Sequence, residues 1–302
     1  MRRFLALALA LFGAACVPAD EALSLGSVQF LFTASDYTVD GARSEDQYAL
    51  RFDRVVLGFK TMTVGKIGAP DTCSYRGRGA ITNAVFDPRH GLVQTFNGIQ
   101  PVECPDVGVI FGTPDDATVP AEGTPPEELV ALANEDAHAI IEATATPPIR
   151  SEGEEPKPYK ILLRFEPIKT STRFGGCRGP GVRGRGDGRG VGILAGERDV
   201  VGVHFAAENL FRNTPTSAGD LRVAPFAQAD RFGNDDRVVT MDELDRLPLT
   251  SVPGSYQLPS DESLTTTRAA SFGDFVRFLF RFTVLYRNQK SGLCVGNPPG
   301  GS

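Results

Sequence analysis

The fold class is clearest in one stretch, Tyr48-Ala49-Leu50-Arg51-Phe52-Asp53-Arg54-Val55-Val56-Leu57-Gly58-Phe59. Large apolar residues fall on every second position from Tyr48 to Phe52, and the alternation resumes on the other parity from Val55 to Phe59. A period of two is typical of a strand that buries one face of a sheet. The change of phase at Asp53-Arg54 predicts a β-bulge, because a bulge inserts one extra residue.

The same alternation recurs along the chain. It is present from Val28 to Phe32, and we expect further strands at Gly79–Phe86, Val107–Gly112, Ala137–Ala145, Tyr159–Phe165 and Val200–Phe205. Many short strands with Gly- and Pro-rich connections are typical of a sandwich or a barrel, and two packed layers are the commoner result. The sequence therefore predicts a mainly β protein, an antiparallel β-sandwich with a few short helices.

Three segments favour those helices. Thr124-Pro125-Pro126-Glu127 has the spacing of a capping box with proline at the first helical position, and Met241–Arg246 predicts a second short helix. The third segment, Ser271–Arg287, is ambiguous, because Ser271 and Asp274 have the spacing of a helix cap while the residues from Val276 to Tyr286 alternate as in a strand. We expect this segment to start as a C-terminal helix.

The N-terminus has the features of an export signal. Met1-Arg2-Arg3 is basic, residues 4–12 are apolar but too short to span a bilayer, and Gly13-Ala14-Ala15 places small residues before Cys16. This pattern resembles a bacterial lipoprotein signal, which implies removal of residues 1–15, lipidation of Cys16 and attachment to a membrane. Gly13 departs from the usual leucine, so cleavage after Ala19, which would release a soluble protein, stays open. Val17 favours the outer membrane as the lipid-anchored location.

Composition bounds the mature protein. Loss of Arg2 and Arg3 leaves 29 of the 31 basic residues against 37 acidic ones, a formal charge of −8, which disfavours a nucleic-acid partner. No later segment is apolar for long enough to cross a membrane. We expect residues 16–302 to form one extracytoplasmic β-rich domain, with the Gly- and Arg-rich residues 179–192 as the place where it could subdivide.

The five cysteines fit an exported protein. Assigning Cys16 to lipid leaves four, which allow three disulfide connectivities. We favour Cys73–Cys104 with Cys177–Cys294, because each pair then lies within one half of the chain, and each disulfide would add roughly 2–4 kcal/mol of stability. A zinc site is disfavoured because no two cysteines lie within four residues of each other.

The sequence contains no recognisable catalytic motif. His90, His138 and His204 do not cluster with one another or with cysteines, and neither an HExxH nor a GxSxG motif occurs. We therefore predict a non-enzymatic protein. A hydrolase stays open only if catalytic side chains meet in the folded structure.

One stretch near the C-terminus has the spacing of a calcium-binding EF-hand loop. If Glu243 is the terminal bidentate ligand, Val238 supplies its carbonyl, and Asp236 and Asn234 fall at the fifth and third positions. Hard Ca²⁺ ions prefer oxygen ligands of these kinds.

The first half of the loop departs from the pattern. Phe232 occupies the first ligand position, and Arg237 occupies the position where glycine normally supplies a left-handed backbone. Asp230 can replace the first ligand only if two extra residues bulge out of the loop. The expected Ca²⁺ ligands are then Asp230, Asn234, Asp236, Val238 and Glu243, and the alternative is a loop that has kept its shape and lost the ion.

Four segments follow one another in an order that resembles uncharacterised secreted bacterial lipoproteins: Gln47–Leu57, Cys104-Pro105-Asp106-Val107, Gly202-Val203-His204 and Asp230–Leu244. In that group the last segment is a DxDGDG-type EF-hand-like loop. The matches there are Asp236, Thr240, Glu243 and Leu244, and the departures are Phe232 and Arg237. The resemblance implies an envelope lipoprotein with a calcium loop, and it does not indicate which activity the protein has.

Together these features predict a membrane-tethered extracytoplasmic lipoprotein that acts as a binding or structural module. The alternative is an accessory protein for metal uptake or handling in the cell envelope. That alternative requires His138, His204 and acidic residues to converge in the fold.

Overall fold

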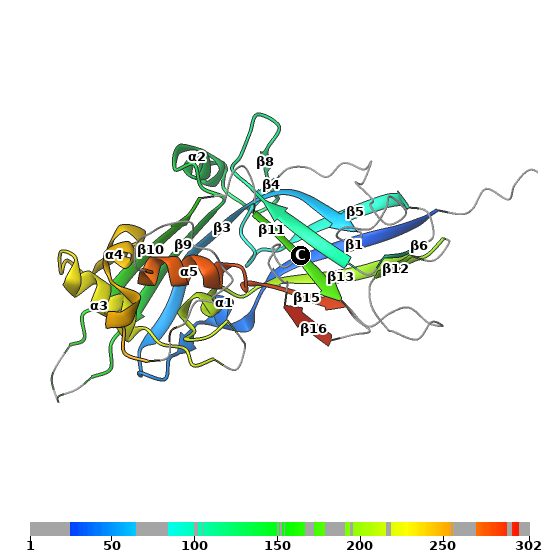
Figure 1. The fold of residues 1–302 in the computed structure, drawn as a ribbon. Helices are drawn as coiled ribbons and strands as arrows, with labels where there is room; N and C mark the ends of the chain where they lie inside the picture. The colour runs from blue at the N-terminus through cyan, green and yellow to red at the C-terminus, as the bar shows by residue number, and fades with distance from the viewer. Residues whose placement is uncertain are drawn as a thin grey trace, which may run out of the picture.

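The structure is a computed structural model that describes residues 25–64, 84–99, 102–104, 106–149, 151, 153, 155–166, 172–178, 191–193, 196–215, 219–254, 256, 270–288 and 292–295. Two mixed sheets face each other, and short helices gather at one end (Figure 1). The prediction of a mainly β, sandwich-like fold with few helices is confirmed.

The smaller sheet has five strands. Their order is β16 (Gly292–Val295), β15 (Val284–Asn288), β13 (Arg198–Phe205), β1 (Gly26–Ala34) and β5 (Leu92–Ile99). Strands β1 and β13 pair in parallel, and the other neighbours pair antiparallel. The parallel pair joins segments about half the chain apart, which is a departure from the strictly antiparallel expectation.

The larger sheet has nine strands. Its main path runs through β11 (Thr172–Arg178), β7 (Asp106–Phe111), β3 (Ala49–Val64), β9 (Ala139–Thr146), β10 (Tyr159–Phe165) and β14 (Val238–Thr240). The short strands at its side are β2 (Ala42–Arg43), β4 (Ala84–Phe86) and β8 (Val119–Pro120). A separate two-stranded sheet pairs β12 (Val191–Ile193) with β6 (Val102–Cys104). Most pairs are antiparallel, while β10–β14 and β4–β8 are parallel.

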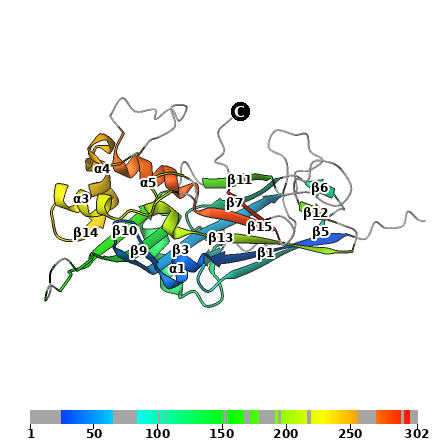
Figure 2. The same cartoon turned by 90° about the horizontal axis from the view of Figure 1, so that it is seen from below.

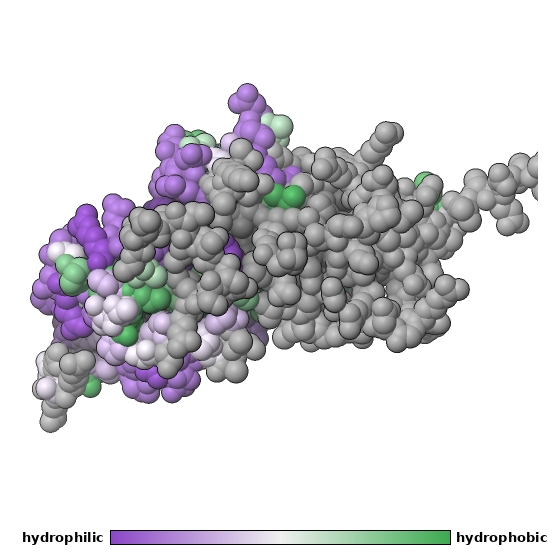
Figure 3. Space-filling view, viewed as in Figure 1, coloured by the Kyte–Doolittle hydropathy of each residue, from purple (hydrophilic) through white to green (hydrophobic). Residues whose placement is uncertain are grey.

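The helices are short. They are α1 (Asp36–Asp40), α2 (Pro126–Asn134), α3 (Ala224–Phe232), α4 (Met241–Arg246), α5 (Phe272–Phe280) and the 3₁₀ turns η2 (Ala207–Phe211) and η3 (Leu249–Ser251). Helices α3, α4 and α5 lie together at the end of the molecule opposite β6 and β12 (Figures 1 and 2). The surface of this helical end is mostly hydrophilic in the view of Figure 3.

Strand β3 confirms the predicted bulge. Its pairing with β9 shifts register between Phe52 and Arg54, where the sequence changes phase. Phe52 and Phe59 therefore both reach the core between the sheets, although their positions differ in parity. There the ring of Phe32, from β1, contacts that of Phe59, from β3, at 5.2 Å between centroids. This edge-on contact between rings of the two sheets contributes to the packing of the two layers.

Helix α2 corrects one prediction. The predicted helix is present, but it begins at Pro126, later than the expected start at Thr124, and its N-cap is Pro125, which makes no side-chain bond, so the predicted capping box at Thr124 is wrong. The Thr124 hydroxyl instead accepts a hydrogen bond from the backbone N–H of Asp87 at 3.3 Å. Both residues are buried, and a buried N–H needs an acceptor more than an exposed helix end does.

The ambiguous C-terminal segment contains both structures. Helix α5 begins after Ser271, whose side chain forms a reciprocal capping box with Asp274, and it ends at Phe280. After a turn in which the Thr283 hydroxyl donates to the Phe280 carbonyl at 2.7 Å, strand β15 continues to Asn288. The predicted helical start is confirmed, and the alternating pattern that follows is expressed as a strand only beyond the turn.

Candidate metal centre

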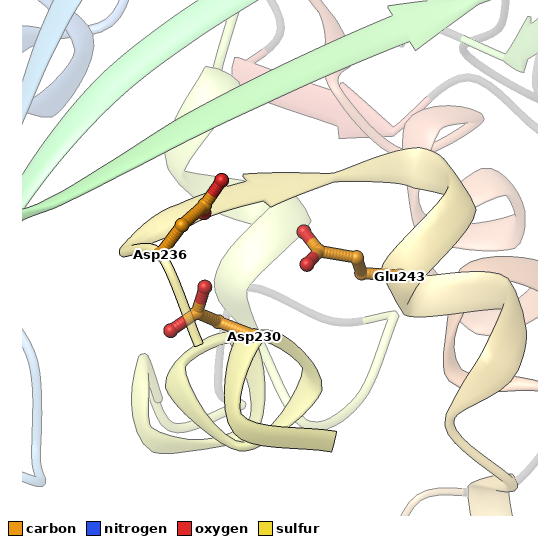
Figure 4. A group of neighbouring side chains, drawn as sticks. All are labelled: Asp230, Asp236 and Glu243. Carbon is orange, nitrogen blue, oxygen red and sulfur yellow. The ribbon is translucent and has the colours of Figure 1, made fainter. Parts of the chain in front are cut away.

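Three carboxylates converge at the helical end. Asp230 lies on α3, Asp236 in the turn that follows, and Glu243 on α4, and each offers an oxygen within 4.8 Å of the others. Figure 4 shows the three side chains pointing toward a common centre. Among the residues that the structure describes, no other group of three His, Cys, Asp or Glu side chains gathers in this way.

Asp230 is the most deeply buried of the three. Its side chain has no exposed surface, its Oδ1 accepts the backbone N–H of Arg237 at 2.9 Å, and its Oδ2 has no hydrogen-bond partner. Burial raises the pKa of the Asp230 carboxyl, and the nearby charge of Glu243 raises it further, against the opposing effect of the bond from Arg237. A buried, unpaired carboxylate oxygen is costly unless a cation or a proton is present.

Glu243 is positioned by the start of α4. Its Oε2 accepts the backbone N–H of Thr240 at 2.9 Å in the helix capping box, while its Oε1 is buried without a partner. Gly233 makes room for this oxygen, because a Cβ at Gly233 would lie 2.5 Å from Oε1. The Glu243 carboxylate therefore uses one oxygen for the helix and presents the other to the cluster.

Asp236 is exposed and is held by its own loop. Its Oδ1 accepts the backbone N–H of Val238 at 2.7 Å, and its Oδ2 accepts the Asn234 side-chain amide at 3.1 Å. The other expected ligands, Asn234 in the same loop and Val238 at the start of β14, thus orient Asp236. A direct ligand role for these two residues stays a prediction.

The backbone at Arg237 has the left-handed conformation that an EF-hand loop needs, although arginine stands there in place of glycine. Arg237 has a left-handed φ of +68° at the position where glycine is usual. Its side chain offsets this strain, because it donates to the Lys157 carbonyl at 2.7 Å and lies over the Tyr159 ring at 5.0 Å. Phe232 is 58% exposed, so Asp230 takes the inner place that the unmodified loop spacing assigned to Phe232.

The histidines do not join this cluster. His138 lies in the core against Phe280, at 5.1 Å between ring centroids, and both of its ring nitrogens lack partners. Burial lowers the pKa of His138 to about 3, so it is neutral at physiological pH. His204 Nδ1 instead lies 2.8 Å from Thr33 Oγ1 on the smaller sheet. The convergence of His138 and His204 that the metal-handling alternative requires is not found among the described residues.

The leader and the cysteines are described only in part. Residues 1–24, which include Cys16, and Cys73 lie outside the described residues. Cys104, Cys177 and Cys294 lie on β6, β11 and β16, whose backbones alone are described. Strands β11 and β16 contact each other, as a Cys177–Cys294 bond requires. Both disulfides stay predictions.

Comparisons with known proteins add no relative. No protein-family model matches the chain, and neither the curated proteins nor the solved structures give a match. None of the helices in the described part of the chain is long and apolar enough to span a membrane. The functional assignment therefore depends on the geometry of the acidic cluster.

Proposed function

We propose that the protein is an exported, membrane-tethered module that binds or supports other envelope components without catalysis, and that its helical end is organised by a bound Ca²⁺ ion. The observation that carries the ion site is the pair of buried, unpartnered oxygens, Asp230 Oδ2 and Glu243 Oε1, beside Asp236. Apposed carboxylates without a cation repel one another, and a divalent cation turns that repulsion into attraction.

The donor set favours Ca²⁺ over other ions. All three side chains offer oxygen, which hard cations prefer, and no histidine or cysteine of the described residues is close enough to complete a site for zinc. Ligand atoms that all lie within 4.8 Å of one another can share one cation, and three converging carboxylates suit Ca²⁺, whereas Mg²⁺ usually takes one or two carboxylates and keeps several waters. The exposed side at Asp236 leaves room for water ligands.

Calcium titration tests this site. We expect saturating Ca²⁺ to raise the melting temperature by about 5–10 °C, because ligand at about 100 times its Kd adds about 2.7 kcal/mol and a domain of this size gains roughly 2–4 °C per kcal/mol. Excess EDTA should reverse the shift, and MgCl₂ at matched ionic strength is the control. An unchanged melting curve at millimolar Ca²⁺ would remove the proposed ion.

Export and anchoring are tested by mass spectrometry of the protein purified from bacterial membranes. We expect a mature N-terminus at an acylated Cys16, with Cys73 joined to Cys104 and Cys177 joined to Cys294. The contact between β11 and β16 supports the second bond. A soluble product that starts after Ala19 would refute the lipid anchor alone. An intact, fully reduced chain in the cytosol would refute export as well.

A further inference from the structure

We infer that ion binding at the acidic cluster is coupled to the seating of α5 on α4, through the ion pair between Asp245 and Arg277. This inference rests on the proposed ion site, and it adds a consequence of occupancy: the ion regulates how firmly the C-terminal helix α5 is held against α4.

Helix α4 connects the acidic cluster to helix α5. It is six residues long, and it carries Glu243 in the acidic cluster and Asp245 two positions later. At about 100° per residue the two carboxylates project from nearly opposite sides of the helix. Asp245 accepts two hydrogen bonds from Arg277 on α5, at 2.6 and 2.7 Å. Because α4 is too short to bend between them, a rotation that moves Glu243 also moves Asp245.

The start of α5 fits closely against this end of α4. A Cβ at Gly273 would meet the Asp245 carboxylate, so the two helices approach as only glycine permits. The Phe272 backbone N–H donates to the Leu247 carbonyl at 2.8 Å, which fixes the first turn of α5 to the residue after α4. A backbone hydrogen bond and an ion pair therefore both join the α4 segment to α5.

The far end of α5 reaches both sheets. The ring of Phe280 stacks on Phe165 of β10 at 4.2 Å between centroids, and lies 6.2 Å from the ring of Phe205 on β13. Strand β14, which leads directly into α4, pairs with β10 as well. An ion that holds Glu243 in place thus favours one position of α4, and through α4 the insertion of Phe280 between the layers.

For the substitution Arg277→Gln, electrostatics and coupling predict opposite changes in Ca²⁺ affinity. Arg277→Gln removes a positive charge and frees the negative charge of Asp245 in the region of the cation site, so electrostatics alone would tighten Ca²⁺ binding or leave it unchanged. Loss of the ion pair between Asp245 and Arg277 makes α4 more mobile and would weaken Ca²⁺ binding. A weaker affinity in this variant can therefore come only from coupling.

The experiment measures Ca²⁺ affinity by titration calorimetry of the full chain. We expect Arg277→Gln to bind Ca²⁺ about 5–10 times more weakly than the wild type, at the lower end of the usual range of coupling between sites. Arg277→Lys, which keeps the charge but not the paired hydrogen bonds, should fall between the two. Arg246→Gln is the matched control, because Arg246 is an exposed arginine of α4 itself. It should bind at least as tightly as the wild type.

Hydrogen exchange of the wild-type protein gives a second readout that needs no variant. Ca²⁺ should slow amide exchange in residues Phe272–Phe280 as well as in the loop around Asp236. If the wild type binds no Ca²⁺, the proposed function itself fails. If the wild type binds Ca²⁺ but α5 exchanges at an unchanged rate, or Arg277→Gln binds as tightly, the site stands and the coupling is refuted. Should Arg277→Gln not fold, Arg277→Lys and the exchange data decide.

Discussion

Replacing His138 by leucine should remove about 3 kcal/mol of acid-induced destabilisation between pH 6.5 and pH 4. His138 is 2% exposed, packs on Phe280 and makes no hydrogen bond through either ring nitrogen. Burial lowers the pKa of the folded side chain from 6.5 to about 3. Leucine fills a similar volume and leaves no polar partner unsatisfied.

The sign follows from proton uptake. Between pH 6.5 and 3 the unfolded state binds a proton at His138 that the folded state does not bind. The free energy of unfolding therefore falls as the pH is lowered through this window, by about 1.4 kcal/mol per pH unit for one such group. Above pH 6.5 the contribution of the neutral histidine is fully present. In the leucine variant this slope disappears, while the slopes of all other groups remain.

Urea denaturation at pH 7, 6, 5 and 4 measures this difference. The stability curves of His138→Leu and wild type should diverge as the pH falls, with the variant the more acid-resistant. His90→Gln is the control, because it removes a histidine whose side chain is 56% exposed, in contrast to the buried His138. Parallel curves for His138→Leu and the wild type would show that His138 titrates normally and is not enclosed as described.

Replacing Asp230 by asparagine should weaken Ca²⁺ binding at least about 100-fold, equivalent to about 2.7 kcal/mol, and at the same time stabilise the Ca²⁺-free protein. Asparagine keeps an oxygen for the N–H of Arg237 but carries no charge. The substitution thus removes a charged ligand, and it also removes the repulsion between the buried carboxylates of Asp230 and Glu243. An inert surface carboxylate would produce neither effect.

Calorimetry in Ca²⁺ and thermal melting in EDTA test the two halves of this prediction separately. Asp242→Asn is the matched control, because Asp242 is an exposed carboxylate of α4 next to Glu243 in sequence. It should change Ca²⁺ affinity only slightly. If Asp230→Asn melts at a lower temperature than the wild type in EDTA, the Asp230 carboxylate has a structural partner and the site is not built for a cation.

Local patterns correctly located several elements of the fold. The phase change at Asp53-Arg54 located the bulge of β3, and the capping spacing at Ser271 and Asp274 located the start of α5. These predictions succeeded because strand period and helix caps depend on residues close in sequence. The spacing at Thr124 failed because a distant residue, Asp87, uses the hydroxyl.

The candidate site was only partly visible in the sequence. Loop spacing identified Asp236 and Glu243. Asp230 matched the first ligand position only if two extra residues bulged out of the loop. The structure meets that condition by ending α3 at an exposed Phe232. The left-handed backbone at Arg237 could not be predicted either. It depends on contacts of the Arg237 side chain with Lys157 and Tyr159, which lie just before and at the start of β10.

The sequence by itself determined the β character, the approximate positions of strands β1, β3, β7, β9, β10 and β13, the starts of α4 and α5, and the acidic residues available to a cation. It did so because alternation, capping and ligand spacing are properties of short segments. Only the tertiary structure decided that β1 pairs in parallel with β13, that His138 is buried against the ring of Phe280, and that the oxygens of Asp230 and Glu243 are buried without partners. Each of these depends on contacts with residues distant in the sequence, and such contacts, unlike periodicity, leave no local pattern.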